Sequence, residues 1–124
     1  GEKVLSPGMK YKHYAPNSDC VLVYSADEEK MIEKIKEIAK NKSNVAIISC
    51  QENVEKYIKI TNSVINVGSK KDLNEISKNI FSALRKVDKI LPDLVVIEGV
   101  KQEGIGLAIM NRLIRACGEN YIEV

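Results

Sequence analysis

The chain has 124 residues, 44% of them hydrophobic and 29% charged, a composition typical of one globular domain. With no Trp and one Phe, the core must be built from Ile, Val, Leu and Ala, which favours an α/β fold over an aromatic-rich β fold. Residues 1–16 account for the whole net charge of +2. The rest of the chain is neutral and offers no broad basic surface to a nucleic-acid backbone.

The spacing of the cysteines and the single histidine does not fit a metal site. Cys20, Cys50 and Cys117 are far apart in sequence, and His13 is the only histidine. Zinc sites need clustered Cys and His ligands, so we expect no metal and predict reduced, buried thiols in a cytoplasmic protein. We find neither a signal peptide nor an apolar run of ~20 residues, and therefore expect no membrane segment. Since the sequence begins at Gly1 rather than at a Met, we expect the chain to be a piece of a longer protein.

Residues 1–19 have neither helical nor strand periodicity and are predicted to be an interdomain linker. They contain the segment SPGMKYKHYAP (residues 6–16), in which two prolines favour turns or extended backbone. The segment also carries apolar and aromatic side chains that a disposable tail would not need. We therefore expect it to dock on another surface, and residues 20–124 to form the folded domain.

From residue 20 onward, short apolar β-branched runs alternate with amphipathic stretches. Strands are predicted at 20–24, 45–49, 63–67, 94–98 and 121–124. Helices are predicted around 31–39, 52–59, 73–91 and 106–117, the last ended by Gly118. This alternation predicts an α/β fold: a Rossmann-like three-layer sandwich of about five mostly parallel strands, with helices on both faces.

Three of the four predicted helices begin with their own capping side chains. The patterns Ser25–Glu28 and Ser49–Glu52 fit capping boxes, and Asp72 with Glu75 places carboxylates in the first turn of the third helix. These helix starts are ordinary and are poor phosphate sites. The fourth helix is entered through Gly104-Ile-Gly106 without a capping side chain, which makes this loop the most available one for an anion or a partner.

The loop and helix that follow the fourth strand supply the candidate contact residues. They are Glu98, Gly104, Gly106, Asn111 and Arg112. A strand-end carboxylate such as Glu98 can pair with Lys, Arg or a donor at a helix start. The glycines permit either tight helix packing or contact with the linker or a partner domain, and the GxGxxI pattern is a poor dinucleotide fingerprint. Arg112 can equally face solvent. Nothing in residues 20–124 forms a catalytic constellation.

Two stretches resemble one known family. SPGMKYKHYAP resembles the interdomain linker of the two-domain L-threonylcarbamoyladenylate synthases, and EGIGLAIMNRLIRAC (residues 103–117) resembles the last helix of their C-terminal domain. In that family a YrdC-like catalytic domain precedes a small Rossmann-like domain. The resemblance implies that threonine, bicarbonate and ATP, with Mg in the full-length enzyme, give threonylcarbamoyl-AMP and pyrophosphate for tRNA modification. The catalytic domain lies outside this sequence, so we expect the fragment alone to be inactive and to bind no cofactor.

The resemblance also implies a role for the linker as a lid over the catalytic cavity. Lys10, Lys12 and a protonated His13 suit anionic substrates, and Tyr11 and Tyr14 add rigid area and hydroxyl groups. A closed lid would keep water from a hydrolysable intermediate. A plain tether whose aromatic residues pack on the adjacent domain is the alternative.

Three hypotheses for the folded domain remain open. The first is an accessory domain that positions the linker for the catalytic domain of the same protein, with threonine, bicarbonate, ATP and tRNA reached only through that partner. The second is a regulatory module that binds a small ligand or nucleotide at the Gly104–Gly106 loop. The third is a tRNA-binding appendage, which the neutral charge of residues 20–124 disfavours.

Overall fold

A computed structural model describes residues 15–124 and places them around one five-stranded sheet. The strands are β1 (Asp19–Tyr24), β2 (Val45–Ser49), β3 (Ser63–Asn66), β4 (Leu94–Glu98) and β5 (Tyr121–Glu123). All paired neighbours run parallel, in the order β3-β2-β4-β1-β5. The predicted α/β fold is confirmed, and every strand lies within one residue of its predicted ends.

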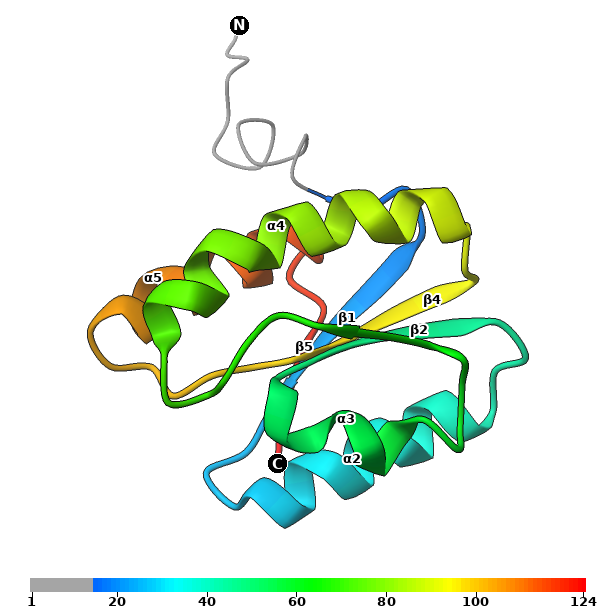
Figure 1. Ribbon diagram of the computed structural model, residues 1–124, viewed down its shortest axis with the longest axis horizontal. Coiled ribbons are helices and arrows are strands. Elements are labelled where there is room, and N and C mark those ends of the chain that lie inside the picture. Colours follow the sequence, from blue (N-terminus) through cyan, green and yellow to red (C-terminus); the bar gives the residue numbers. More distant parts are fainter. Residues whose placement is uncertain (1–14) are drawn as a thin grey trace, which may run out of the picture.

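The helices form a layer on each side of this sheet (Figure 1). They are α2 (Glu28–Lys40), η2 (Gln51–Asn53), α3 (Val54–Tyr57), α4 (Leu73–Ile90) and α5 (Ile105–Ala116). The chain steps in one direction from β1 to β3 and in the other from β3 to β5. Because right-handed crossovers place helices on opposite faces when that direction reverses, α2 and α3 cover one face while α4 and α5 cover the other.

Each helical layer has its own apolar core. Beneath α4 the buried face follows the helical period through Ile76, Ile80, Leu84 and Val87, packed on residues of β1, β2 and β4. Beneath α2 the smaller cluster includes Met31, Ile32, Ile35, Ala39 and Tyr57. A fully buried Ile or Leu contributes about 1.5–3 kcal/mol, so these two clusters supply the main stabilisation of the fold.

The helix starts differ in part from the predicted caps. Asp27, rather than Ser25, caps α2, because its carboxylate accepts from the backbone N–H of Glu29 and Lys30. The second capping box is wrong: the start at Cys50 has no side-chain cap, and η2 with α3 is shorter than the predicted helix. The prediction that Asp72 caps α4 is confirmed by its bond from the Glu75 N–H.

The described chain enters the domain at the amino ends of the strands. Pro16 is buried, and the backbone N–H of Asn17 donates to Oδ1 of Asp88, near the end of α4, over 2.8 Å. The next strand, β1, then runs into the sheet between β4 and β5. Lys10, Tyr11, Lys12, His13 and Tyr14 lie outside the described residues, so their predicted lid role stays a prediction.

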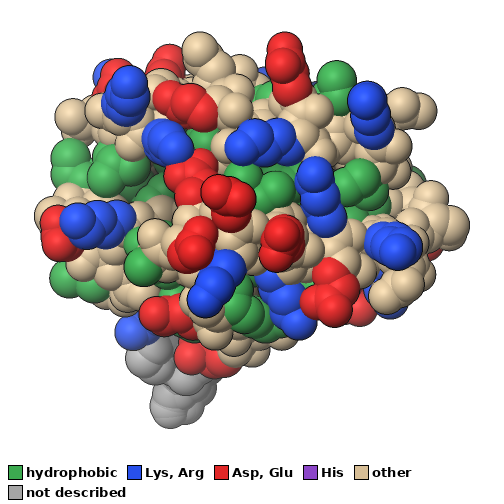
Figure 2. Space-filling view, turned by 90° about the horizontal axis from the view of Figure 1, so that it is seen from below, with side chains coloured by type: hydrophobic (Ala, Val, Ile, Leu, Met, Phe, Trp, Pro, Cys, Tyr) green, Lys and Arg blue, Asp and Glu red, His purple; other side chains and the backbone are tan. Residues whose placement is uncertain are grey.

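Surface charge is mixed over the face that carries α2 and α3. Figure 2 shows acidic and basic side chains interspersed there, with no field of one sign. Residues 15–124 contain equal numbers of acidic and basic residues. A nucleic-acid backbone is bound by clustered Lys and Arg, so this face does not have the expected character of a tRNA-binding surface. Within the described part of the chain, no helix is long and apolar enough to cross a bilayer.

Candidate functional site

The carboxyl ends of β1, β2 and β4 meet at one edge of the sheet, where the crossovers change face. In open parallel sheets ligands bind outside such strand ends, at the point where the helices that follow adjacent strands lie on opposite faces. A cavity of about 300 Å³ lies at this edge. It is lined by Tyr24, Ser25, Ala26, Glu28, Met31, Cys50, Val67, Lys70, Leu73, Ile76, Ile80, Glu98, Gly99, Val100, Lys101, Ile109 and Leu113.

Glu98, the last residue of β4, is the polar centre of this edge and is only 6% exposed. Its Oε1 accepts the backbone N–H of Cys50 over 2.8 Å. Its Oε2 accepts from the Asn53 amide over 2.9 Å and from the Tyr57 hydroxyl over 2.5 Å. The pairing expected for Glu98 with a donor at a helix start is therefore present, at the start of η2.

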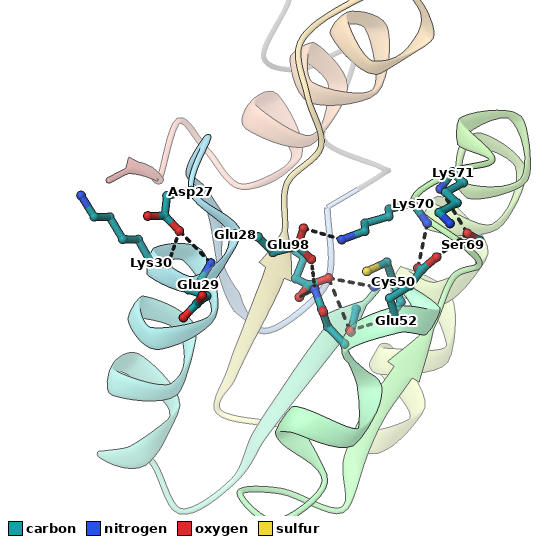
Figure 3. Close-up of polar contacts among 12 residues, drawn as sticks. Asp27, Glu28, Glu29, Lys30, Cys50, Glu52, Ser69, Lys70, Lys71 and Glu98 are labelled. Atoms are coloured by element: carbon teal, nitrogen blue, oxygen red, sulfur yellow. Dashed lines mark hydrogen bonds and ion pairs between the residues drawn. The ribbon is translucent and has the colours of Figure 1, made fainter.

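A chain of contacts links Glu98 to the cavity mouth. The Asn53 amide nitrogen bonds both Glu98 and Oε2 of Glu28, the latter over 2.8 Å. The other oxygen of Glu28 accepts from the Lys70 ammonium over 2.6 Å. Figure 3 shows that Glu28, Lys70 and Glu98 come from separate segments and converge in front of the sheet edge. The ion pair between Glu28 and Lys70 thus joins the start of α2 to the loop ahead of α4.

The loop that carries Lys70 is also held by η2, the short helix ahead of α3. Glu52 accepts the Ser69 hydroxyl over 2.5 Å and the Lys70 backbone N–H over 3.0 Å. These hydrogen bonds stabilise the ionised carboxyl and lower the pKa of Glu52 to about 2. The hydrogen bond from Lys70 to Glu28 likewise raises the pKa of Lys70, so that side chain stays an ammonium.

Burial and the nearby Glu98 carboxylate keep one thiol group and one hydroxyl group protonated. Burial first, and then the charge of Glu98, raises the pKa of the Cys50 thiol to about 12. The same two causes raise the pKa of the Tyr57 hydroxyl. Neither group is prepared to act as a nucleophile near neutral pH, because the thiolate rather than the thiol is reactive.

The hydrogen bonds around Glu98 limit its use in proton transfer. The oxygens of Glu98 already accept three short hydrogen bonds, so the carboxylate is poorly suited to act as a general base. Among residues 15–124, no group of three or more His, Cys, Asp or Glu side chains is placed to hold a metal ion. All three cysteines are free and buried, as predicted.

The Gly104–Gly106 loop lies beside the cavity and starts α5 without a side-chain cap, as predicted. Gly104 has φ +57°, a conformation that favours glycine. At Gly106 an added Cβ would lie 2.0 Å from the Lys101 carbonyl oxygen, so only glycine allows the backbone approach seen here. The close approach at Gly106 is to the loop at Lys101 and not to the sheet, which differs from the helix-on-sheet packing offered as one alternative. At Gly104 an added Cβ would meet nothing within 4 Å.

Three comparisons with known proteins agree with one another. The family model for the C-terminal domain of threonylcarbamoyl-AMP synthase matches residues 1–118. The chain belongs to this family. The threonylcarbamoyl-AMP synthase of Pyrococcus abyssi is 38% identical over 96% of the chain, and that of Bacillus subtilis is 32% identical over 98%. In both cases the chain spans only 34% of the relative, so it corresponds to the C-terminal domain.

Solved structures of the family share the fold. The structure of P. abyssi Sua5 complexed with L-threonine matches with a TM-score of 0.75 and 34% identity, over 96% of this chain and 34% of that one. The C-terminal Sua5 domain of Pyrococcus horikoshii matches with a TM-score of 0.65 and 34% identity. This match covers 89% of the present chain and 100% of the solved chain, so a relative of this domain has been crystallised by itself.

The structure separates the predicted contact residues of this family member. Glu98 lines the cavity, and Gly104 and Gly106 lie at the start of α5 outside its lining, whereas Asn111 and Arg112 are exposed further along α5. Contact of the linker with these residues stays a prediction. Five further residues of this edge were not predicted from the sequence: Glu28, Cys50, Asn53, Tyr57 and Lys70. The available signal was that Cys50 directly follows β2 and that Glu28 and Lys70 lie shortly after β1 and β3, because parallel strands bring such residues together.

Proposed function

We propose that the chain is the C-terminal domain of a threonylcarbamoyl-AMP synthase that acts in tRNA modification, and that it holds the interdomain linker for the catalytic domain. That enzyme would convert L-threonine, bicarbonate and ATP to threonylcarbamoyl-AMP, pyrophosphate and water. The observation that carries the proposal is the family match, which includes the linker segment and spans 118 residues. The names of the relatives supply the activity.

The polar groups of the domain support an accessory role. The buried carboxylate of Glu98 accepts hydrogen bonds from Cys50, Asn53 and Tyr57, and the Cys50 thiol is held protonated. The chain's only histidine, His13, belongs to the linker. Chemistry on threonine, bicarbonate and ATP would therefore be left to the catalytic domain, which this chain would assist by positioning a segment.

The point of attachment supports the positioning role. Pro16 is buried and Asn17 is bonded to Asp88, so the linker is held by the domain from residue 16 onward. Fourteen residues precede Ala15, and a chain of that length spans at most about 50 Å. A fixed end of this kind raises the effective concentration of the linker at the catalytic domain without any further contact.

The proposal is tested by removing the domain and restoring it. We would compare the whole protein with a form that ends after Pro16, and measure threonylcarbamoyl-AMP formation from L-threonine, bicarbonate and ATP. Loss of synthesis in the shortened form, with intact ATP binding by its catalytic domain, is the expected result. Full activity without residues 17–124 would show that the domain does not position the linker.

A further inference from the structure

We infer that the cavity at the carboxyl edge of the sheet is a binding site for a small zwitterionic amino acid with an aliphatic side chain. This site is separate from the linker attachment, which lies at the amino ends of the strands. It is also independent of the proposed function, because binding can be measured on the 124-residue chain alone. The argument rests on the size of the cavity, its apolar floor and the charges at its mouth.

The floor of the cavity is formed by branched aliphatic side chains of α4 and α5. Leu73, Ile76 and Ile80 come from α4, and Ile109 and Leu113 come from α5. A volume of about 300 Å³ corresponds to about ten water molecules in the liquid, enough for a ligand of about ten non-hydrogen atoms. Ligand sites are commonly apolar cavities with a few polar groups that fix orientation.

Two ammonium groups at the lining have donors to spare. Lys70 uses one N–H for Glu28, and an ammonium has three. Lys101 pairs with Glu103 over 3.4 Å in an exposed contact that a ligand can replace at little expense, since such pairs are worth about 0–1 kcal/mol. These donors suit the carboxylate of a ligand.

Glu98 supplies the complementary charge. It lines the cavity and is nearly fully buried, yet its partners are an N–H, an amide and a phenol rather than a cation. The Ser49 hydroxyl also contacts Oε1, over 3.4 Å, but its shorter bond is to the Cys50 carbonyl over 2.8 Å, so a stronger donor can take its place on Oε1. Buried charges are stabilised by a paired opposite charge, and an α-ammonium would provide it.

A zwitterion with a branched side chain satisfies all three parts of the site. Its ammonium would meet Glu98, its carboxylate would meet Lys70 and Lys101, and its side chain would lie on the aliphatic floor. Leucine, isoleucine and valine fit this description. Threonine fits less well, because the aliphatic floor offers no partner to its hydroxyl group.

The test is calorimetric titration of the chain with L-leucine, 4-methylpentanoate and isoamylamine, which share the branched tail but differ in charge. We expect saturable binding of L-leucine, with each singly charged analogue at least about tenfold weaker. Absence of saturable L-leucine binding up to 10 mM would overturn the inference. Equal affinity for either analogue, or tighter binding of L-threonine, would overturn the assignment as well.

Three variants locate the binding within the molecule. Lys70→Gln removes a donor at the cavity mouth and is expected to weaken L-leucine binding about tenfold. Lys71→Gln changes the same charge next to it, outside the lining, and should leave binding unchanged. Leu73→Trp, at the half-buried start of α4, should fill the cavity and abolish binding, with folding checked by its thermal transition. Equal effects of the two lysine variants would place the ligand elsewhere.

Discussion

The Tyr57 hydroxyl donates to Glu98 over 2.5 Å, although the two residues lie 41 positions apart and on different elements. Both side chains are buried, Tyr57 completely. The contact joins the four-residue helix α3 to the central strand β4. A helix this short is not stable alone, so its position depends on such tertiary contacts.

We therefore predict that Tyr57→Phe destabilises the fold by about 1.5–3 kcal/mol, the usual contribution of a hydrogen bond to a charged group. The ring still fills its site, so the loss is confined to the hydroxyl. Urea unfolding followed by circular dichroism measures it. Tyr121→Phe is the matched control, because its hydroxyl donates over 2.8 Å to the exposed Glu123. A loss in the control as large as that at Tyr57 would contradict this account.

Acid stability provides a second prediction through Glu52. Its pKa is about 2 in the folded chain against an ordinary value of 4.5, because Ser69 and the Lys70 N–H bind its ionised form. The contribution of this group to stability is therefore present above pH 4.5 and is lost as the pH falls toward 2. The side chain is exposed, so screening keeps the contribution below about 1 kcal/mol.

Glu52→Gln should consequently lower the free energy of unfolding at pH 6 and have no effect near pH 2. Urea titrations of both proteins at pH 6, 4 and 2.5 give the comparison. Glu55→Gln removes the same charge from an exposed position on α3 and serves as the control. Its free energy of unfolding should differ between pH 6 and pH 2.5 by the same amount as in the parent chain. A Glu52→Gln effect that grows toward low pH would have the wrong sign for this mechanism.

Two glycines at the start of α5 should respond differently to alanine. Gly106→Ala would place a Cβ 2.0 Å from the backbone oxygen of Lys101. Because the backbone must move to relieve this clash, we expect a loss of stability of about 3 kcal/mol or more. In Gly104→Ala the added Cβ would meet open space. The only cost is the strain of an alanine at φ +57°, and we expect a loss of stability of about 1–2 kcal/mol. Thermal unfolding ranks the two, and the reverse order would contradict the close approach at Gly106.

The fold was largely predictable because its signals are local. Branched apolar runs such as Val45–Ser49 and the helical spacing of α4 appear directly in the sequence, and the parallel strands follow from their alternation. The strand order was not predicted, since it depends on which strands pair. The capping error at Ser25 has a physical cause: its hydroxyl accepts the Asp27 N–H in a turn, and Asp27 then begins the helix.

The candidate site was less predictable because its contacts are between distant segments. Glu98 was singled out as a strand-end carboxylate, but its partners lie 41 to 48 positions earlier in the chain. Neither Asn53 nor Tyr57 belongs to a recognisable motif. Only the strand order brings the end of β2 beside β4, and a cavity at that edge depends on how α4 and α5 pack.

Thiol reactivity tests the burial of the cysteines. Cys20, Cys50 and Cys117 are at most 8% exposed, and burial with the charge of Glu98 raises the pKa of Cys50 to about 12. We predict that a disulfide reagent such as dithiobis(nitrobenzoate) modifies none of them rapidly at pH 8 in the native chain, and all three in denaturant. A native thiol that reacts as fast as free cysteine would show that at least one of these sites opens readily.

The attachment of the linker yields the last prediction, made for the whole protein. Asp88→Ala removes the acceptor of the Asn17 N–H and one partner of Arg85. Because this contact is at the surface, the stability of the domain should fall by less than about 1 kcal/mol. If the linker depends on this fixed end, the rate of threonylcarbamoyl-AMP synthesis should fall even at temperatures where the variant remains fully folded. Asp93→Ala, an exposed change near the same end of the sheet, is the control. Equal activity of the two variants would mean that the Asp88 contact does not position the linker.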